Sequence, residues 1–182
     1  HLAKDDKKMY DKLVSVGKHT DRLLRLVNQL LDFRKHETDN VRLKVGEGNF
    51  VKFIKEIVIA FGEVARSKSI DLSFYSTEDV IPLWFDRDQM EKVIYNLLSN
   101  ALKFSSKNAR VEISVSKSEP NKRFPFGALT FSVCDNGIGI PAKSLEDIFS
   151  RYYRVDRLSG LIEGSGIGLA LAKAVVDLHK GE

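Results

Sequence analysis

The spacing of the apolar residues changes near residue 41, and this change constrains the fold more than any other feature of the 182-residue chain. Upstream of it, a stripe of residues recurs at alternating intervals of three and four, as on one face of a helix. The stripe consists of Leu13, Val16, Thr20, Leu23, Val27 and Leu30, and Leu24 and Leu31 widen it. Because a single helix cannot bury so broad a stripe, we expect residues 1–40 to form a long bundle helix that packs on a partner helix.

Downstream of residue 41, apolar and polar residues alternate in five short segments, which predicts strands between helices. The expected strands lie near residues 41–45, 70–74, 81–85, 111–115 and 129–133, and the expected helices over residues 50–65, 88–104 and 166–178. Asn49 is a candidate cap for the first of these helices. Residues 118–127 hold two of the four prolines and are expected to form a hairpin loop. This mixture predicts an α+β fold, arranged as a two-layer α/β sandwich, that begins after the polar residues 36–40.

The composition excludes several classes of protein. Lys plus Arg number 29 and Asp plus Glu number 25, which gives a net charge of +4 with both signs interspersed. This pattern indicates a solvated surface rather than direct binding of nucleic acid. The single cysteine, Cys134, permits neither an internal disulfide nor a cysteine-based zinc site, and suits a reducing compartment. No apolar run approaches the roughly 18 residues of a membrane span, and residues 1–8 are too polar for a signal peptide.

Three polar residues stand beside the apolar face of the helix expected at residues 88–104. The apolar positions are Met90, Val93, Ile94, Leu97, Leu98, Ala101 and Leu102. Asn96, Asn100 and Lys103 fall in a narrow stripe along their edge. Asparagine is a poor helix former, and a functional interpretation is available: amide oxygens can bind Mg²⁺, and a lysine beside them can meet phosphate. The alternative is that these side chains are polar residues tolerated on an exposed face.

Two glycine-rich segments follow. In the first, Asp135 comes directly after an apolar strand and is expected to be an acceptor at a buried edge, while Gly137 and Gly139 let the backbone approach a flat ligand. An ordinary turn is the alternative. In the second, three glycines precede the last expected helix, an arrangement that can hold phosphate at the helix N-terminus. These glycines are Gly164, Gly166 and Gly168; neither the dinucleotide spacing nor a Walker sequence is present.

The segment between the two glycine motifs, residues 148–154, combines arginines with aromatic residues. The residues that follow it, about 155–163, could close over a ligand. A short amphipathic helix followed by a disordered loop is the alternative.

Together, in this order and spacing, these segments resemble the ATP-binding domain of bacterial sensor histidine kinases. Residues 96–105 resemble its N box, residues 135–139 its G1 box, residues 149–154 its F box and residues 164–168 its G2 box. Residues 22–33 resemble the second helix of the dimerisation and phosphotransfer hairpin. The resemblance implies a Bergerat-type fold, whose mixed sheet is covered on one face by helices. It also implies two parts: the second hairpin helix at residues 1–40, and an ATP-binding catalytic domain at residues 41–182 that is shortened at its C-terminus.

The resemblance also implies roles for individual residues toward the cofactors ATP and Mg²⁺. Asp135 would accept from the adenine amino group, Asn100 would hold Mg²⁺, and Asn96 would lie close to the phosphates. Lys103 and Arg154 would meet phosphate oxygens. The backbone at Gly166 and Gly168 would meet the phosphates, within a mobile lid at about residues 155–165. The implied nucleotide-binding residues are Asn96, Asn100, Lys103, Asp135, Gly137, Gly139, Tyr153, Arg154, Gly164, Gly166, Gly168 and Leu169.

The implied activity is transfer of the γ-phosphate of ATP to a histidine, followed by relay to an aspartate of a response regulator. Related ATPases carry a water-activating glutamate one turn before the Mg²⁺-binding asparagine, and here that position is Asn96, which cannot act as a base. This favours a protein acceptor over water. An ATPase that drives dimer clamping and a non-catalytic nucleotide-binding or docking module remain the alternatives.

The chain departs from the family at the acceptor. None of His1, His19, His36 and His179 lies in the expected His-Glu-[Leu/Phe]-Arg-Thr-Pro context. We therefore expect the chain to bind Mg-ATP without phosphorylating itself, and to need the first hairpin helix, a second copy in a homodimer and a receiver domain as partners. The resemblance further implies the cytoplasmic portion of a sensor that is anchored in the inner membrane by segments upstream. Residues 22–35 resemble those of hybrid sensors, which carry receiver and DNA-binding domains on the same chain.

Overall fold

The structure is a computed structural model in which the chain divides into two compact units, His1–Val41 and Arg42–Glu182. It describes residues 9–10, 12–17, 20, 23–24, 27, 31, 42–120, 122–125, 127–155 and 164–182. In the first unit the described residues are helical, and the stripe residues Leu13, Val16 and Leu23 are exposed. The helix is therefore present at the described positions, whereas its partner in a hairpin stays a prediction.

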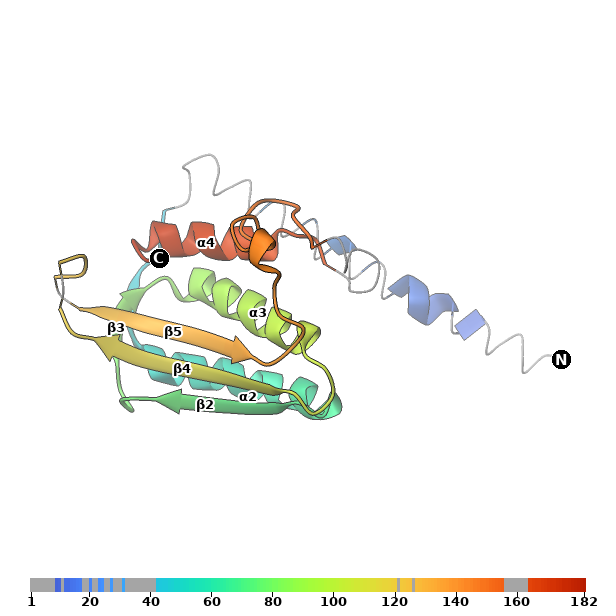
Figure 1. Ribbon diagram of the computed structural model, residues 1–182, viewed down its shortest axis with the longest axis horizontal. Coiled ribbons are helices and arrows are strands. Elements are labelled where there is room, and N and C mark those ends of the chain that lie inside the picture. Colours follow the sequence, from blue (N-terminus) through green and yellow to red (C-terminus); the bar gives the residue numbers. More distant parts are fainter. Residues whose placement is uncertain are drawn as a thin grey trace. The chain divides into compact units, whose positions relative to one another are not determined.

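The second unit mixes strands and helices in the expected order. In chain order its elements are β1 (Gly46–Asn49), α2 (Phe50–Ser67), β2 (Asp71–Ser76), β3 (Pro82–Phe85), α3 (Arg87–Phe104), β4 (Arg110–Ser118), β5 (Ala128–Asp135), a short 3-10 turn (Ala142–Ser144) and α4 (Gly168–Leu178), as Figure 1 shows. The predicted hairpin is confirmed, because β4 ends at Ser118 and the antiparallel β5 begins at Ala128.

The strands form two sheets rather than one. A three-stranded sheet has the order β2-β4-β5, with β2 parallel to β4 and β5 antiparallel to it, so it is mixed as expected. A separate two-stranded sheet pairs β1 with β3. In the larger sheet Val111 lies opposite Asp135 and Glu112 lies opposite Cys134, a register that decides which face each side chain occupies.

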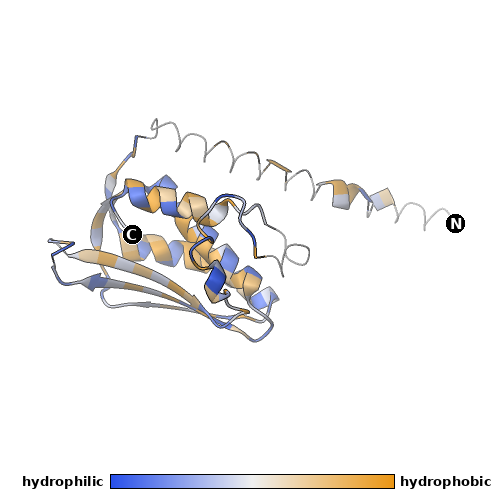
Figure 2. Cartoon of the chain, turned by 45° about the horizontal axis from the view of Figure 1, so that its top comes forward, coloured by the Kyte–Doolittle hydropathy of each residue, from blue (hydrophilic) through white to orange (hydrophobic). Residues whose placement is uncertain are grey.

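Helices cover one face of the three-stranded sheet. Figures 1 and 2 show α2 and α3 against the same face with their apolar sides turned toward it, and α4 packs along α3. The core contains Phe53 and Ile54 from α2, Leu98 from α3 and Ile113 from β4, all at most 2% exposed. On the other face of the sheet, residues such as Glu112 stay exposed. This arrangement confirms the two-layer α/β sandwich.

Two side chains set where the helices begin. The Oδ1 atom of Asn49 accepts hydrogen bonds from the backbone N–H groups of Val51 (3.1 Å) and Lys52 (3.4 Å), which confirms the predicted cap. The Oδ1 atom of Asp86 accepts from the N–H of Gln89 at 3.0 Å and caps α3 in the same way.

One predicted strand is wrong. The alternation at residues 41–45 indicated a strand, but residues 42–45 are irregular and the strand is Gly46–Asn49. The reason is tertiary: Gly46 to Asn49 pair with the four residues of β3, whereas the N–H of Lys44 donates to Asp86 Oδ2 at 2.7 Å. Pairing has overridden the local apolar pattern.

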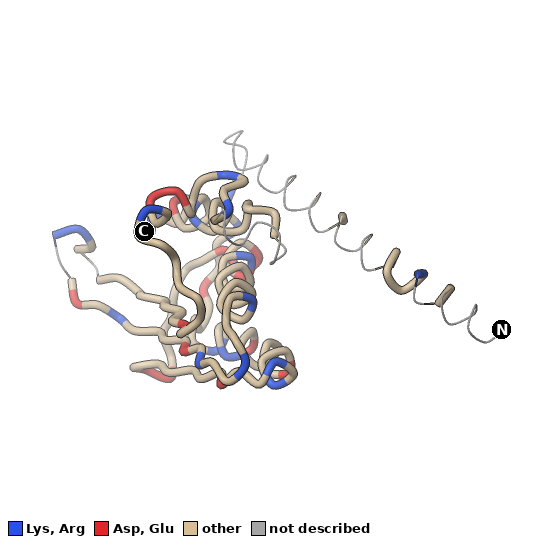
Figure 3. The backbone as a smooth tube through the Cα atoms, turned by 45° about the vertical axis from the view of Figure 1, so that its right-hand side comes forward, with Lys and Arg blue, Asp and Glu red and all other residues tan. Residues whose placement is uncertain are grey.

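The surface carries charges of both signs. Figure 3 shows basic and acidic residues scattered over the described helices, strands and loops of the second unit. Within the described part of the chain, no helix is both long and apolar enough to cross a bilayer.

Candidate functional site

The segments singled out by the sequence meet at α3, and glycines make the close approaches possible. A methyl group at Gly168 would lie 2.8 Å from Asn96 Oδ1, and one at Gly164 would lie 2.7 Å from Lys103 Nζ. One at Gly137 would lie 2.4 Å from the carbonyl oxygen of Phe104, the last residue of α3. All three distances are shorter than real side-chain contacts allow. The structure therefore brings residues 96–104, 135–139 and 164–168 together.

The polar stripe on α3 lies at the edge of the core, as predicted. Asn96, Asn100 and Lys103 are half-buried, whereas Leu98 between them is fully buried. The ammonium group of Lys103 lies 4.7 Å from the centre of the Phe104 ring, a cation–π distance. Lys103 also lies in the last turn of α3, where its positive charge interacts favourably with the negative end of the helix dipole. The three side chains thus present two amides and one cation along one side of the helix.

Asp135 faces the helix layer from the end of β5. Its partner in the register is Val111, whose side chain is fully buried under the helices, so both point to the covered face of the sheet. Asp135 Oδ1 accepts a hydrogen bond from the N–H of Gly137 at 2.9 Å. No second hydrogen bond to this carboxylate occurs among the described residues, which leaves Oδ2 able to accept from a ligand.

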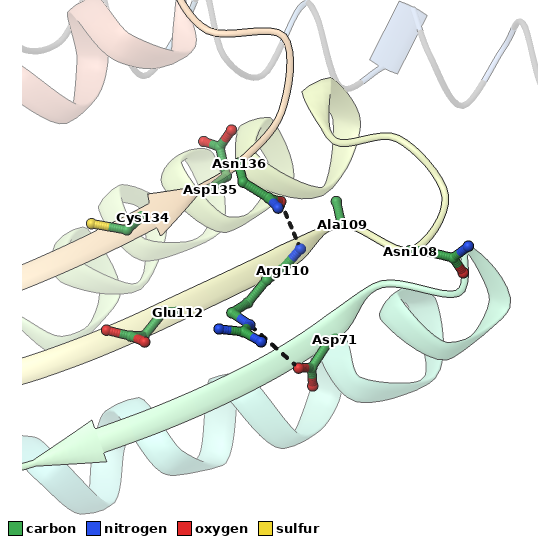
Figure 4. Close-up of a pocket in the computed structure, with 8 residues that line it drawn as sticks. All are labelled: Asp71, Asn108, Ala109, Arg110, Glu112, Cys134, Asp135 and Asn136. Carbon is green, nitrogen blue, oxygen red and sulfur yellow. Dashed lines mark hydrogen bonds and ion pairs between the residues drawn. The ribbon is translucent and has the colours of Figure 1, made fainter.

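The expectation that Asp135 lies at a buried edge is wrong in one respect. The residue faces the covered side, but its side chain is exposed. The side chain is exposed because Asp135 is the last residue of β5, which is an edge strand of the three-stranded sheet. Figure 4 shows its carboxylate turned away from Arg110 and Glu112.

Hydrogen bonds hold the turn after Asp135 to both α3 and β4. The N–H of Ile138 donates to the carbonyl oxygen of Phe104 at 3.2 Å, which fixes the turn to the end of α3. Asn136 Oδ1 accepts from the N–H of Arg110 at 2.7 Å, which fixes it to β4. Gly139 has a φ of +68°, which a glycine adopts without strain. Sequence reasoning missed Asn136, although an asparagine after a strand and before glycine is a recognisable turn signal.

Tyr152 connects the aromatic segment to the second glycine motif. Its N–H donates to the carbonyl oxygen of Gly166 at 3.0 Å, and a methyl group at Gly166 would lie 2.7 Å from the Tyr152 carbonyl carbon. Both residues have positive φ, +59° and +70°. Tyr153 and Arg154 follow, both half-buried. Sequence reasoning missed Tyr152, because nothing in the sequence marks a left-handed tyrosine.

The remaining expectations for residues 148–163 have different outcomes. Over 148–155 the structure describes turns and irregular backbone, so the alternative of a short amphipathic helix is not what forms there. Residues 156–163, most of the predicted lid, lie outside the described residues.

The N-terminus of α4 differs from those of α2 and α3. Ile167 precedes it and no described side chain caps it, whereas Asn49 and Asp86 cap the other two helices. Gly168 and Leu169 open its first turn and are half-buried. The first N–H groups of a helix have no partner within the helix and carry the positive end of its dipole. This end of α4, beside Asn96, is suited to bind an anion such as phosphate.

A separate hollow of about 380 Å³ lies on the uncovered side of the sheet and at the end of β5, shown in Figure 4. Its lining residues are Asp71, Asn108, Ala109, Arg110, Glu112, Cys134, Asp135 and Asn136. Two of these lining residues form an ion pair, in which the Arg110 guanidinium lies 3.7 Å from Asp71. The hollow contains none of the α3 residues, so it is not the place where the motifs converge.

Comparison with known proteins shows the family of the chain. Residues 85–182 match the sequence family described as histidine kinase-, DNA gyrase B-, and HSP90-like ATPase. Histidine kinase P4 of Formosa agariphila is 35% identical over 98% of this chain and 13% of its own length. Sensor histidine kinase WalK of Bacillus subtilis is 32% identical over 93% of this chain and 27% of its own length. The chain thus spans well under a third of these relatives.

Solved structures show the same fold. The catalytic domain of histidine kinase ThkA superimposes with a TM-score of 0.62 at 23% identity, over 75% of this chain and 82% of that one. Full-length ShkA in complex with AMPPNP gives a TM-score of 0.71 at 22% identity, over 86% of this chain and 31% of that one. The family match establishes that the chain belongs to the histidine kinase-, DNA gyrase B-, and HSP90-like ATPases, and the shared fold agrees with it.

Proposed function

We propose that this chain binds Mg-ATP between α3 and the two glycine segments and donates the γ-phosphate to a histidine on a dimerisation helix, for relay to an aspartate of a response regulator. The observation that carries the proposal is the convergence on α3. Gly168 meets Asn96, Gly164 meets Lys103 and Gly137 meets the end of the helix, each closer than a side chain would permit. A flat base and a chain of phosphates need such exposed backbone.

Asp135 would recognise the base. Its Oδ1 is occupied by the N–H of Gly137, which orients the carboxylate, and Oδ2 can accept from the exocyclic amino group of adenine. Gly137 and Gly139 shape the turn beside it, where no side chain could be added at residue 137 without contact with α3. A carbonyl group in place of the amino group, as in guanine, would face a carboxylate and be rejected.

The phosphates would lie between α3 and the start of α4. The uncapped first turn at Gly168 and Leu169 offers backbone N–H groups, Gly164 and Gly166 keep the approach open, and Lys103 supplies positive charge. We expect Tyr153 and Arg154 to reach the same region, because the hydrogen bond between Tyr152 and Gly166 holds the preceding residue against the second glycine motif.

Asn100 fits a magnesium ion. An amide oxygen is a ligand that Mg²⁺ accepts, and in phosphoryl-transfer sites one or two protein oxygens commonly share the ion with phosphate oxygens and water. When bound, Mg²⁺ neutralises negative charge on the phosphate oxygens. Asn100 would hold the ion one helical turn after Asn96, on the half-buried side of α3.

A protein acceptor is favoured over water. The side chain nearest the start of α4 is Asn96, whose amide cannot take a proton from water. The two relatives are named histidine kinase P4 and sensor histidine kinase WalK, and ThkA has been solved in complex with the response regulator TrrA. We extend this to a homodimer that presents the acceptor helix, and to the cytoplasmic side of a membrane-anchored sensor.

Binding of a non-hydrolysable ATP analogue with Mg²⁺, measured by calorimetry, tests the site. Asp135→Asn keeps the acceptor for Gly137 but turns the other oxygen into a donor, so we expect roughly 10- to 100-fold weaker binding. Glu112→Gln is the matched control, since it makes the same change on the opposite face of the sheet and should leave affinity unchanged. Equal affinities for the Asp135 variant and the unchanged chain would refute the assignment.

Labelled ATP tests the reaction. A helical hairpin with a His-Glu-x-Arg-Thr-Pro string, supplied in trans, should acquire acid-labile label, while this chain alone should not. Steady release of inorganic phosphate without an acceptor would instead support the ATPase alternative.

A further inference from the structure

His179 directly follows α4, and its two hydrogen bonds fix which ring nitrogen carries the proton. Its Nδ1 lies 2.8 Å from the carbonyl oxygen of Val175, which can only accept, so Nδ1 carries the hydrogen. Its Nε2 lies 3.1 Å from the backbone N–H of Asp86, which can only donate, so Nε2 presents its lone pair. The hydrogen-bond network therefore assigns the neutral Nδ1–H tautomer to a half-buried ring.

The hydrogen bond to His179 satisfies the last polar group of Asp86, its backbone N–H. It is 5% exposed, and its carboxylate accepts from Gln89 N–H at 3.0 Å and from Lys44 N–H at 2.7 Å. As the cap of α3, it has a backbone N–H with no partner inside the helix. A buried N–H group without a partner is costly, and His179 supplies the acceptor.

The contact lies at the opposite end of α4 from the nucleotide site. Gly168, at the start of α4, lies against Asn96, and His179, just past its end, lies against Asp86. The two helices therefore run antiparallel. At about 1.5 Å per residue, the ten steps from Asp86 to Asn96 and the eleven from Gly168 to His179 both span roughly 15–17 Å. Because these two segments are of nearly equal length and are in contact at both of their ends, α4 is held at one position along α3.

We propose that His179 is a positioning residue for the nucleotide site. Through the lone pair on Nε2 it holds the cap of α3 against the end of α4, and so keeps Gly168 and the uncapped first turn of α4 beside Asn96. This inference rests on the proposed function, because Asn96 and the start of α4 are the groups placed there at the phosphates.

Two substitutions of His179 distinguish the effect of its hydrogen-bond acceptor from the effect of its side-chain volume. His179→Leu removes both polar atoms and should weaken binding of a Mg²⁺–AMPPNP complex about tenfold. His179→Gln returns an oxygen acceptor at similar reach and should bind within about threefold of the unchanged chain. Asp177→Asn is the matched control, since Asp177 is exposed in the last turn of α4 and pairs only with Lys173 among described residues. It should bind like the unchanged chain.

Nitrogen-15 NMR of the unchanged chain near neutral pH provides a measurement that does not depend on any variant folding. The imidazole of His179 should show a protonated Nδ1 and an unprotonated Nε2. A ring protonated at Nε2, or at both nitrogens, would overturn the inference, and so would equal affinities for the folded leucine and glutamine variants. If the unchanged chain binds no nucleotide, the proposed function fails first; if it binds and His179→Leu binds equally well, only this inference fails.

Discussion

Gly137→Ala is the sharpest single test of how the site is built. The added methyl group would lie 2.4 Å from the carbonyl oxygen of Phe104 and 3.0 Å from its carbonyl carbon. Both atoms belong to the backbone at the end of α3, so no side-chain rotation can relieve the contact. The turn or the helix end has to move, and the hydrogen bond from Ile138 N–H to that same oxygen, 3.2 Å long, is the interaction most directly lost.

The magnitude follows from two contributions. Overpacking a tight site costs about 1–3 kcal/mol, and the lost hydrogen bond about 0.5–1.5 kcal/mol. The free energy of unfolding should therefore fall by about 2–4 kcal/mol, which for a chain of this size lowers the melting temperature by roughly 5–15 °C. Affinity for a Mg²⁺–ATP analogue should fall as well, because Asp135 Oδ1 bonds the N–H of the displaced residue.

Urea and thermal denaturation followed by circular dichroism measure the stability, and calorimetry below the melting point measures the affinity. Gly62→Ala is the matched control, because it makes the same change inside α2, where nothing lies within 4 Å. That variant should be more stable by about 0.5–1 kcal/mol, with unchanged affinity. A Gly137→Ala variant that unfolds within about 0.5 kcal/mol of the unchanged chain and binds nucleotide normally would refute the reasoning.

Three further substitutions test other parts of the structure. Asn49→Ala removes the oxygen that accepts from two N–H groups of α2 and from Ile81 N–H, and should cost about 1–2 kcal/mol in urea denaturation. Lys68→Met removes the ammonium group 2.9 Å from the Leu102 carbonyl oxygen near the end of α3, and should cost about 0.5–1.5 kcal/mol in the same measurement. Asn100→Ala should leave stability within about 0.5 kcal/mol but abolish the gain in nucleotide affinity that added Mg²⁺ provides, as titration calorimetry with and without the metal would show.

The helices could be predicted because their signals are local. The apolar spacing placed α3 at residues 88–104, and the structure has it at Arg87–Phe104. Asn49 was recognisable as a cap because asparagine is preferred just before the first turn of a helix, where its side-chain oxygen accepts from free N–H groups. A periodic face and a polar cap are read from neighbouring residues, so no knowledge of the tertiary structure was needed.

The parts that failed depend on distant residues. The four residues of β1 read Gly-Glu-Gly-Asn, which carries no strand pattern, and they are extended because β3 pairs with them. The role of His179 could not be seen either, because its partner Asp86 is 93 positions away. The exposure of Asp135 follows from its place at the end of a border strand, which alternation alone does not reveal.

The three glycines at the start of α4 each allow a close approach to a different neighbouring residue. Methyl groups at 164, 166 and 168 would contact the Lys103 ammonium, the Tyr152 backbone and the Asn96 amide, respectively. The ammonium group ends a flexible side chain and can move, the amide moves less easily, and the backbone cannot yield. Gly166 also has a φ of +70°, which costs an alanine roughly 1–2 kcal/mol more. Single alanine substitutions should therefore lower the melting temperature most at Gly166, less at Gly168 and least at Gly164, and any other order in a thermal scan would contradict these contacts as the reason for the spacing.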